Sequence, residues 1–128
     1  MRMGNAFAGR RILVVEDEYL LAQCLADLLQ SEGAEVVGPA SCVADANALL
    51  EGNCLPDVAV LDINLGSEDV YPLADRLADH HVPRLFTSGY ERDLVPPRHA
   101  GCPHCAKPFG VEQVRTRLLA LLDDTADA

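Results

Sequence analysis

The chain has 128 residues, which is enough for one domain with a single core. Its 20 acidic and 10 basic side chains give a formal net charge of −10. This charge argues against nucleic acid and anionic membrane as primary partners, because both repel the chain. No apolar run reaches the roughly 18 residues of a membrane span, and residues 1–10 lack the unbroken apolar block of a secretory signal. With five cysteines, an odd number, we expect free thiols and a cytoplasmic location.

In the first half of the chain, short β-branched runs alternate with segments of helical period. We expect a strand at 12–15, followed by a helix whose leucines share one face and which ends at Gly33 in a left-handed cap. A second strand at 35–38 precedes a helix that begins after an N-cap at Ser41. The continuous apolar run 58–61 predicts a third strand that is buried on both sides.

The same alternation continues through the second half of the chain. Apolar residues at helical spacing over 70–77 predict a third helix, and strands are expected at 84–87 and 104–106. A final helix carries apolar residues at helical spacing over 111–122. The expected organisation is an N-terminal extension at 1–9, one domain at 10–122 and an acidic tail at 123–128.

The strict alternation of strand and helix predicts the fold class. It implies right-handed crossovers and a parallel sheet that helices cover on both faces. Five such units form a small α/β domain with an open, doubly wound sheet. In such folds the functional site lies beyond the carboxyl ends of the strands, so the residues that follow each strand are candidates for function.

Acidic side chains follow two of the expected strands, and a hydroxyl and an ammonium group follow two others. These residues are Glu16 and Asp17, then Asp62, Ser88 and Lys107. Carboxylates about 5 Å apart repel by roughly 3 kcal/mol per pair at an effective dielectric constant near 20. A hard divalent cation offsets this repulsion, and Mg²⁺ prefers sites made only of oxygen. With Mg²⁺ bound, one carboxylate can attack a phosphoryl group while Ser88 and Lys107 take up charge on its oxygens.

Four motifs at these strand ends resemble the receiver domain of two-component response regulators. They are Glu16-Asp17, Asp62-Ile63-Asn64, Ser88-Gly89 and Lys107-Pro108-Phe109. The resemblance covers about residues 10–122, and it implies the strand order 2-1-3-4-5. The stretches 14–19 and 86–90 look most like stand-alone, single-domain regulators that work with histidine kinases of the HWE type.

The resemblance implies a metal site and a phosphoacceptor. Asp62 would be phosphorylated, Asp17 would bind Mg²⁺ directly, and Glu16 would bind it directly or through water. Asn64 would offer its backbone carbonyl to the same ion.

The resemblance also implies how the phosphoryl group is handled. Ser88 would bind it and Lys107 would pair with it, and the Lys107–Pro108 bond would be cis. The phosphoryl group would come from the phosphohistidine of a histidine kinase, and the domain would signal to a downstream protein or phosphotransfer partner. It would catalyse only its own phosphorylation and dephosphorylation.

The region between the last two strands departs from the family pattern. The family has a helix there, but residues 90–103 of this chain include Pro96, Pro97, Gly101 and Pro103. Proline removes backbone donors and restricts the residue before it, so we expect one short turn or an irregular loop. His104 stands where the family often has a switching aromatic, and a shift of Ser88 toward the phosphoryl group would open space for it. Alternatively, His104 is an exposed residue of an edge strand.

Two other functions are compatible with the sequence. Glu16, in place of the usual Asp, allows a degenerate receiver that binds partners without phosphorylation, although the exchange keeps the charge. Residues 102–105 match the CxxC motif of thioredoxin-like oxidoreductases, with His99 as a further candidate ligand for zinc. A redox CxxC needs a helix N-terminus, whereas a proline follows at 108. Zinc needs four ligands, and this stretch offers few with workable spacing.

Overall fold

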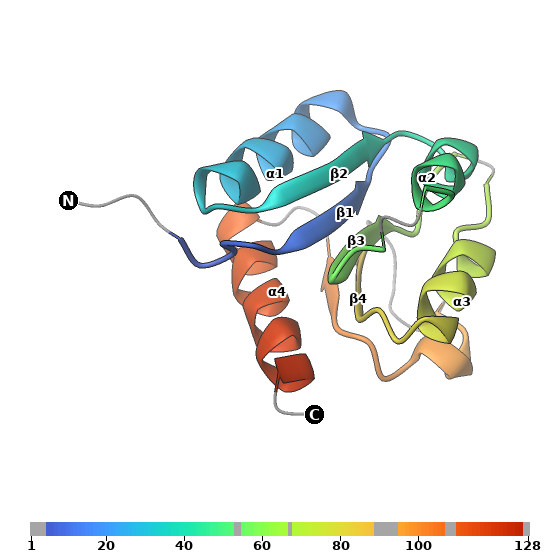
Figure 1. Cartoon of the computed structure of the whole chain (residues 1–128). Helices are drawn as coiled ribbons and strands as arrows, with labels where there is room; N and C mark the ends of the chain where they lie inside the picture. Colours follow the sequence, from blue (N-terminus) through green and yellow to red (C-terminus); the bar gives the residue numbers. More distant parts are fainter. Residues whose placement is uncertain (1–4, 53–54, 67, 89–94, 107–109, 127–128) are drawn as a thin grey trace.

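The computed structural model describes residues 5–52, 55–66, 68–88, 95–106 and 110–126 (Figure 1). Its elements are β1 (Arg11–Val15), α1 (Tyr19–Ser31), β2 (Glu35–Ala40), α2 (Val43–Leu50), β3 (Val58–Asp62), α3 (Tyr71–Asp79), β4 (Arg84–Ser88), the 3₁₀ turn η2 (Pro97–His99), β5 (His104–Ala106) and α4 (Val111–Ala126). The strands form one parallel sheet in the order β2-β1-β3-β4-β5. The predicted fold class and strand order are confirmed, and each observed strand contains the expected one.

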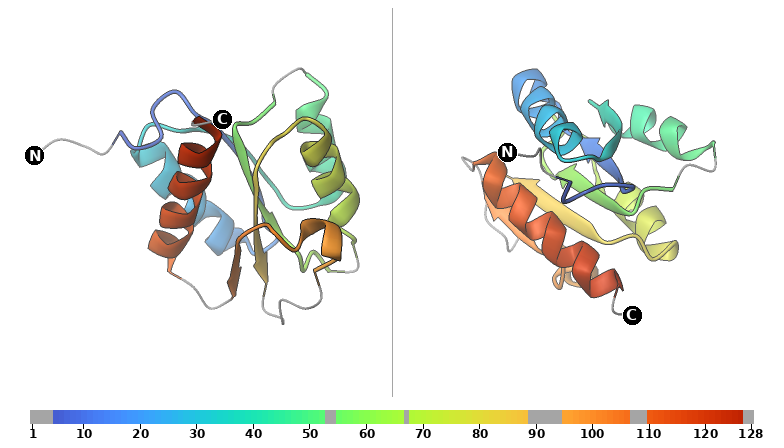
Figure 2. Two further views of the ribbon diagram at one scale, coloured as in Figure 1. Left: turned by 90° about the horizontal axis from the view of Figure 1, so that it is seen from below. Right: turned by 60° about the vertical axis from the view of Figure 1, so that its left-hand side comes forward.

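Helices cover both faces of the sheet, with α1 and α4 over one face and α2 and α3 over the other (Figure 2). β3 is buried along its whole length because its alternate side chains enter two separate cores. Val58 and Val60 join the core under α1 and α4, whereas Ala59 and Leu61 join the core under α2 and α3. The central place of β3 in the sheet therefore explains why its sequence is apolar at consecutive positions.

The apolar face of α1 follows helical spacing. Its buried residues are Ala22, Leu25, Ala26 and Leu29. The helix ends at Ser31, and Gly33 has a φ of +95°, the left-handed conformation that favours glycine. A Cβ at Gly33 would lie 3.0 Å from the Cα of Ala8, so the N-terminal turn packs closely over this end of the helix.

The segment expected to be an N-terminal extension places one side chain in the core. Phe7 is fully buried and belongs to the same core as Ile12 and Leu29. Its backbone N–H donates to the carbonyl of Glu32 at 2.9 Å, and the N–H of Arg10 donates to the carbonyl of Phe7 at 2.9 Å. Residues 5–10 therefore form a turn that closes one end of the core under α1 and α4.

Two helix ends differ from the sequence-based expectation. α2 has Cys42 as its N-cap, so the predicted N-cap at Ser41 is wrong. The backbone N–H of Val43 donates instead to Oε1 of Glu68 at 3.1 Å, from the loop after β3. A distant carboxylate thus satisfies a donor that a local cap would otherwise satisfy. At the other end of the chain, α4 continues to Ala126, so residues 123–126 of the expected acidic tail are helical.

The described part of the connection between β4 and β5 has little regular structure, as predicted for it. In its described part, residues 95–103, the only helical element is the single turn η2. Proline at 96, 97 and 103 explains this, because each ring removes a backbone donor. Residues 89–94 lie outside the described residues, and so does the Lys107–Pro108 bond that we expect to be cis.

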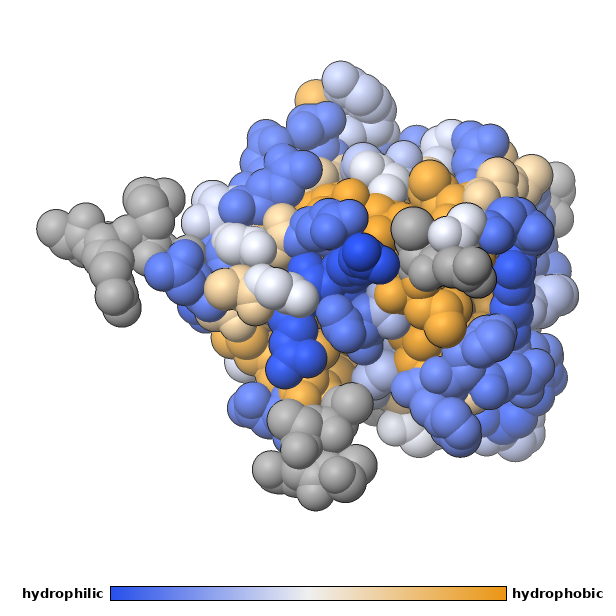
Figure 3. Space-filling model, viewed as in Figure 1, coloured by the Kyte–Doolittle hydropathy of each residue, from blue (hydrophilic) through white to orange (hydrophobic). Residues whose placement is uncertain are grey.

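The outer surface on the face shown in Figure 3 is mostly hydrophilic, with apolar side chains visible in patches between. Among the described residues, the large apolar side chains exposed to solvent are Tyr19, Leu20, Leu49 and Leu55. No helix in the described part of the chain is long and apolar enough to cross a bilayer.

Candidate functional site

Three carboxylates meet at the C-terminal ends of two neighbouring strands. Glu16 and Asp17 follow β1, and Asp62 is the last residue of β3, which pairs with β1. One oxygen of each carboxylate lies within 4.8 Å of the other two. Glu16 is 2% exposed and Asp62 is 0% exposed, whereas Asp17 faces solvent. The structure thus brings together the three acids that the sequence places after strands.

The donor set and its charge fit a hard divalent cation. Three carboxylates this close repel one another, and burial of two of them reduces the screening by water. Their oxygen donors are the type that Mg²⁺ prefers, and the exposed side at Asp17 leaves a route from solvent. The residues present therefore fit a magnesium ion.

Backbone donors hold two of the three carboxylates in place. The N–H of Asn64 donates to Oδ1 of Asp62 at 2.9 Å, and the N–H of Glu18 donates to Oε2 of Glu16 at 3.1 Å. The chain directly after Asp62 is also held, because the N–H of Ile63 donates to the carbonyl of Thr87 at 2.8 Å. Both acids are therefore oriented by the turns that follow their own strands.

The remaining predicted site residues come from the neighbouring strands. Ser88 is the last residue of β4 and is buried, one position after Thr87, which is in register with Asp62. His104 begins β5 in register with Phe86, and it is buried. The alternative in which His104 is an exposed edge residue is therefore wrong, while its role as a switch stays a prediction. Lys107 lies outside the described residues.

A pocket of about 160 Å³ opens beside the acids. Its lining includes Glu16, Asp17, Tyr19 and Pro39. Tyr19 and Leu20, at the start of α1, are each 76% exposed. This apolar surface is not among the sequence-based predictions, although two large apolar residues directly after the acidic run could have indicated it.

The two cysteines of the CxxC motif pack on opposite sides of the sheet. Cys102 packs against the core under α2 and α3, whereas Cys105 is buried in the core under α1 and α4. Burial raises the pKa of the Cys105 thiol. Among the described residues, the acidic trio is the only group of three or more possible ligands with the geometry to hold an ion. This arrangement argues against redox or zinc chemistry at the motif.

The match to a family model decides the classification. Residues 12–118 match the model of the response regulator receiver domain. The chain belongs to this family. The observed strand order and the acids at the ends of β1 and β3 are therefore those of a receiver domain.

Individual relatives extend this result. The receiver domain is 39% identical to SdrG from Sphingomonas melonis Fr1, with a TM-score of 0.75, over 91% of this chain and 98% of that one. A CheY-like receiver domain protein from Methanospirillum hungatei JF-1 has a TM-score of 0.80 over 92% of this chain and 97% of that one, but at 23% identity it shows the fold alone.

Among curated proteins, the transcriptional regulatory protein PdtaR from Mycobacterium tuberculosis is 32% identical over an alignment of 114 positions that covers 86% of this chain and 55% of PdtaR. The virulence transcriptional regulatory protein PhoP from Salmonella typhimurium is 35% identical over an alignment of 117 positions that covers 88% of this chain and 51% of PhoP. The chain therefore spans about half the length of these curated relatives.

Proposed function

We propose that this receiver domain accepts a phosphoryl group on Asp62 from the phosphohistidine of a histidine kinase in the cytoplasm. The observation that carries the proposal is the buried Asp62 carboxylate, oriented by the N–H of Asn64 and lying within 4.8 Å of Glu16 and Asp17. A domain of this kind catalyses its own phosphorylation and dephosphorylation only, and passes the signal on by binding a downstream protein or phosphotransfer partner.

In the transfer step, a carboxylate oxygen of Asp62 forms a bond to phosphorus. The phosphorus–nitrogen bond of the donor breaks at the same time, and its electron pair returns to the donor imidazole. The hydroxyl of Ser88 hydrogen-bonds the phosphoryl oxygens and Lys107 pairs with their charge. Mg²⁺, held by Glu16, Asp17, Asp62 and the backbone carbonyl of Asn64, would neutralise the charge that collects at this site. The decisive experiment is phosphoryl transfer to wild type and to Asp62→Asn.

The proposed metal site leads to a first prediction, which concerns the effect of Mg²⁺ on stability. Mg²⁺ should raise the free energy of unfolding, because it binds the folded site and not the unfolded chain. A concentration about 100 times the dissociation constant would add about 2.7 kcal/mol. Asp17→Ala should abolish this response in a thermal unfolding titration with MgCl₂. The substitution also removes one of the three mutually repelling carboxylates from the metal-free site. Asp45→Ala, an exposed acid in the first turn of α2, should respond as wild type does. An unchanged response in Asp17→Ala would remove Asp17 from the metal site.

The exposed start of α1 leads to a second prediction, which concerns the rate of phosphoryl transfer from the kinase. The donor must reach Asp62 from solvent, and Leu20, the residue after Tyr19 at the start of α1, is 76% exposed. The assay uses the histidine kinase that phosphorylates wild type fastest. Leu20→Ala should slow phosphoryl transfer from this kinase by about tenfold, which is equivalent to about 1.4 kcal/mol of interface contact. Labelling by acetyl phosphate, which needs no protein contact, should stay at the wild-type rate.

The matched control for this prediction is Leu49→Ala. Leu49 is also an exposed leucine, but it lies on α2. It should leave both rates unchanged. Equal slowing of the kinase and acetyl phosphate reactions by Leu20→Ala would mean that the substitution damages the site itself rather than a docking surface.

For signalling, we propose that Ser88 and His104 form the switch. Ser88 is the last residue of β4, and Phe86 precedes it by two positions on that strand. His104, the first residue of β5, is in register with Phe86. A movement of Ser88 toward the phosphoryl group would change the space available to His104. The resemblance of the stretches 14–19 and 86–90 to single-domain regulators that work with HWE-type kinases supports a kinase of this type as the partner.

A further inference from the structure

The hydroxyl group of Thr87 is buried in the sheet without a hydrogen bond. Thr87 is 0% exposed, and its Oγ1 has no hydrogen-bond partner among the described residues. A buried hydroxyl that makes no hydrogen bond costs free energy, because it has given up its bonds to water. A valine has nearly the same shape and no polar atom, so this hydroxyl does not stabilise the unphosphorylated domain. It points to a state of the domain in which the hydroxyl has a partner.

The register of the sheet places Thr87 next to Asp62. Thr87 is paired with Asp62 on β3 and with Cys105 on β5. Paired residues of neighbouring parallel strands face the same side of the sheet, and the strands lie about 4.8 Å apart. Cys105 is buried in the core under α1 and α4, so Thr87 and Asp62 face that side as well. Ser88, the next residue of β4, faces the other side.

Of the two neighbours, Asp62 is the one that can gain an acceptor for Thr87. The thiol of Cys105 is only a weak acceptor. Oδ1 of Asp62 accepts from the N–H of Asn64 at 2.9 Å, and neither carboxylate oxygen is hydrogen-bonded to Thr87. A phosphoryl group would extend the Asp62 side chain by one phosphorus atom and three charged oxygens, which are strong acceptors. Acceptors would then occupy space that the carboxylate does not reach.

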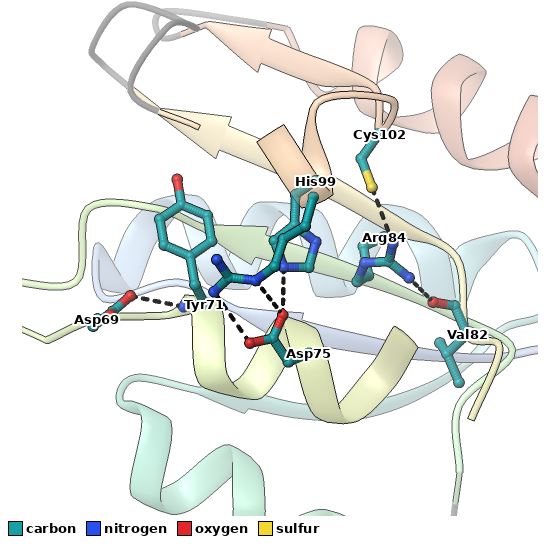
Figure 4. A network of polar contacts seen from close by, with 8 residues as sticks. Asp69, Tyr71, Asp75, Val82, Arg84, His99 and Cys102 are labelled. Carbon is teal, nitrogen blue, oxygen red and sulfur yellow. Dashed lines mark hydrogen bonds and ion pairs between the residues drawn. The ribbon is translucent and has the colours of Figure 1, made fainter. Parts of the chain in front are cut away.

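The backbone of β4 is held at both ends, so the Thr87 hydroxyl has a fixed position. At the start of the strand, Arg84 donates to the carbonyl of Val82 at 2.7 Å and to Sγ of Cys102 at 3.2 Å (Figure 4). Near its end, the carbonyl of Thr87 accepts from the N–H of Ile63 at 2.8 Å. A donor that is already in place when a charge arrives loses little freedom in binding it.

We propose that Thr87 is a second hydroxyl donor to the phosphoryl group, in addition to Ser88. This inference rests on the proposed phosphorylation of Asp62. In the unphosphorylated domain the Thr87 hydroxyl is unused. After transfer it donates a hydrogen bond to a phosphoryl oxygen from the side of α1 and α4, and it thereby stabilises the phosphorylated state relative to the unphosphorylated one. Two consecutive residues of β4 thus bind the phosphoryl group from two sides of the sheet.

Beryllofluoride with MgCl₂ tests the proposal, because it binds to a carboxylate as a mimic of the phosphoryl group. Thr87→Val should weaken its binding by about tenfold, which corresponds to about 1.4 kcal/mol for the lost hydrogen bond to a charged group. Thr87→Ser keeps the hydroxyl, so its affinity should stay within about threefold of wild type. In the ¹⁹F NMR spectrum, Thr87→Val should shift a resonance of the bound fluorines, which stand in for the phosphoryl oxygens.

Urea denaturation of the full chain without Mg²⁺ or beryllofluoride is the second measurement. Thr87→Val should keep or raise the wild-type midpoint, because it removes a buried hydroxyl that makes no hydrogen bond among the described residues. The matched control is Thr116→Val, the same exchange at an exposed position of α4. Oγ1 of Thr116 donates to the carbonyl of Glu112 at 3.0 Å, far along the chain from the acids. This variant should bind beryllofluoride as wild type does.

The possible outcomes separate this inference from the proposed function. Binding of beryllofluoride to Thr87→Val with wild-type affinity would overturn the inference alone. Weaker binding with unchanged ¹⁹F resonances would also overturn it, because Thr87 would then act through another group. A lower urea midpoint for Thr87→Val would show that the hydroxyl is already used in the unphosphorylated domain, with the same consequence. Wild type that binds no beryllofluoride would overturn the proposed function, and this inference with it.

Discussion

Asp62→Asn should take up no phosphoryl group under conditions in which wild type takes up one. An amide lacks the negative charge that makes a carboxylate oxygen attack phosphorus, yet Asn keeps the shape and an oxygen that can accept from the N–H of Asn64. Intact-mass measurement after incubation with acetyl phosphate and MgCl₂ checks this result. Because small donors differ in efficiency, a histidine kinase is the second donor if wild type shows no gain in mass.

The matched control is Asp57→Asn. Asp57 lies just before the opposite end of β3, where its Oδ2 accepts from the N–H of Arg11 at 2.8 Å. It should be labelled to the wild-type extent. Equal labelling of Asp62→Asn and wild type would show that the phosphoacceptor is another residue. Wild type that no donor labels, but that still binds a partner, would favour the degenerate receiver that the Glu16 substitution allows.

Phe7→Ala should lower the free energy of unfolding by about 3–5 kcal/mol. The Phe7 ring is fully buried in the core under α1 and α4, so its loss leaves a cavity that the sheet and two helices cannot readily fill. Urea denaturation measures the effect. Tyr19→Ala removes an aromatic ring of similar size that is 76% exposed, and it should change stability by less than about 0.5 kcal/mol. A loss below about 1 kcal/mol for Phe7→Ala would mean that residues 5–10 detach readily from the domain.

The order of elements and the chemistry at the strand ends could be predicted from the amino-acid sequence alone. The period of the hydrophobic residues distinguishes strands from helices. The consecutive apolar residues of β3 indicate a central strand, because a strand between two helical layers is apolar on both faces. Once the strands are parallel, their C-terminal ends must meet at one edge. Glu16, Asp17 and Asp62 could therefore be placed together without coordinates. The short η2 turn followed in the same way from the positions of prolines.

Features that depend on contacts between distant segments are visible only in the folded chain. Phe7 lies outside every periodic segment, and it is buried because its turn hydrogen-bonds to Glu32 at the end of α1. The start of α2 is satisfied by Glu68, a residue of another loop, so local rules selected the wrong cap. His99 is one residue of a proline-rich stretch, and nothing local predicts that Asp75, 24 positions earlier, holds its ring. Each of these contacts joins groups that become neighbours only when the chain has folded, because side-chain pairing across elements has no sequence period.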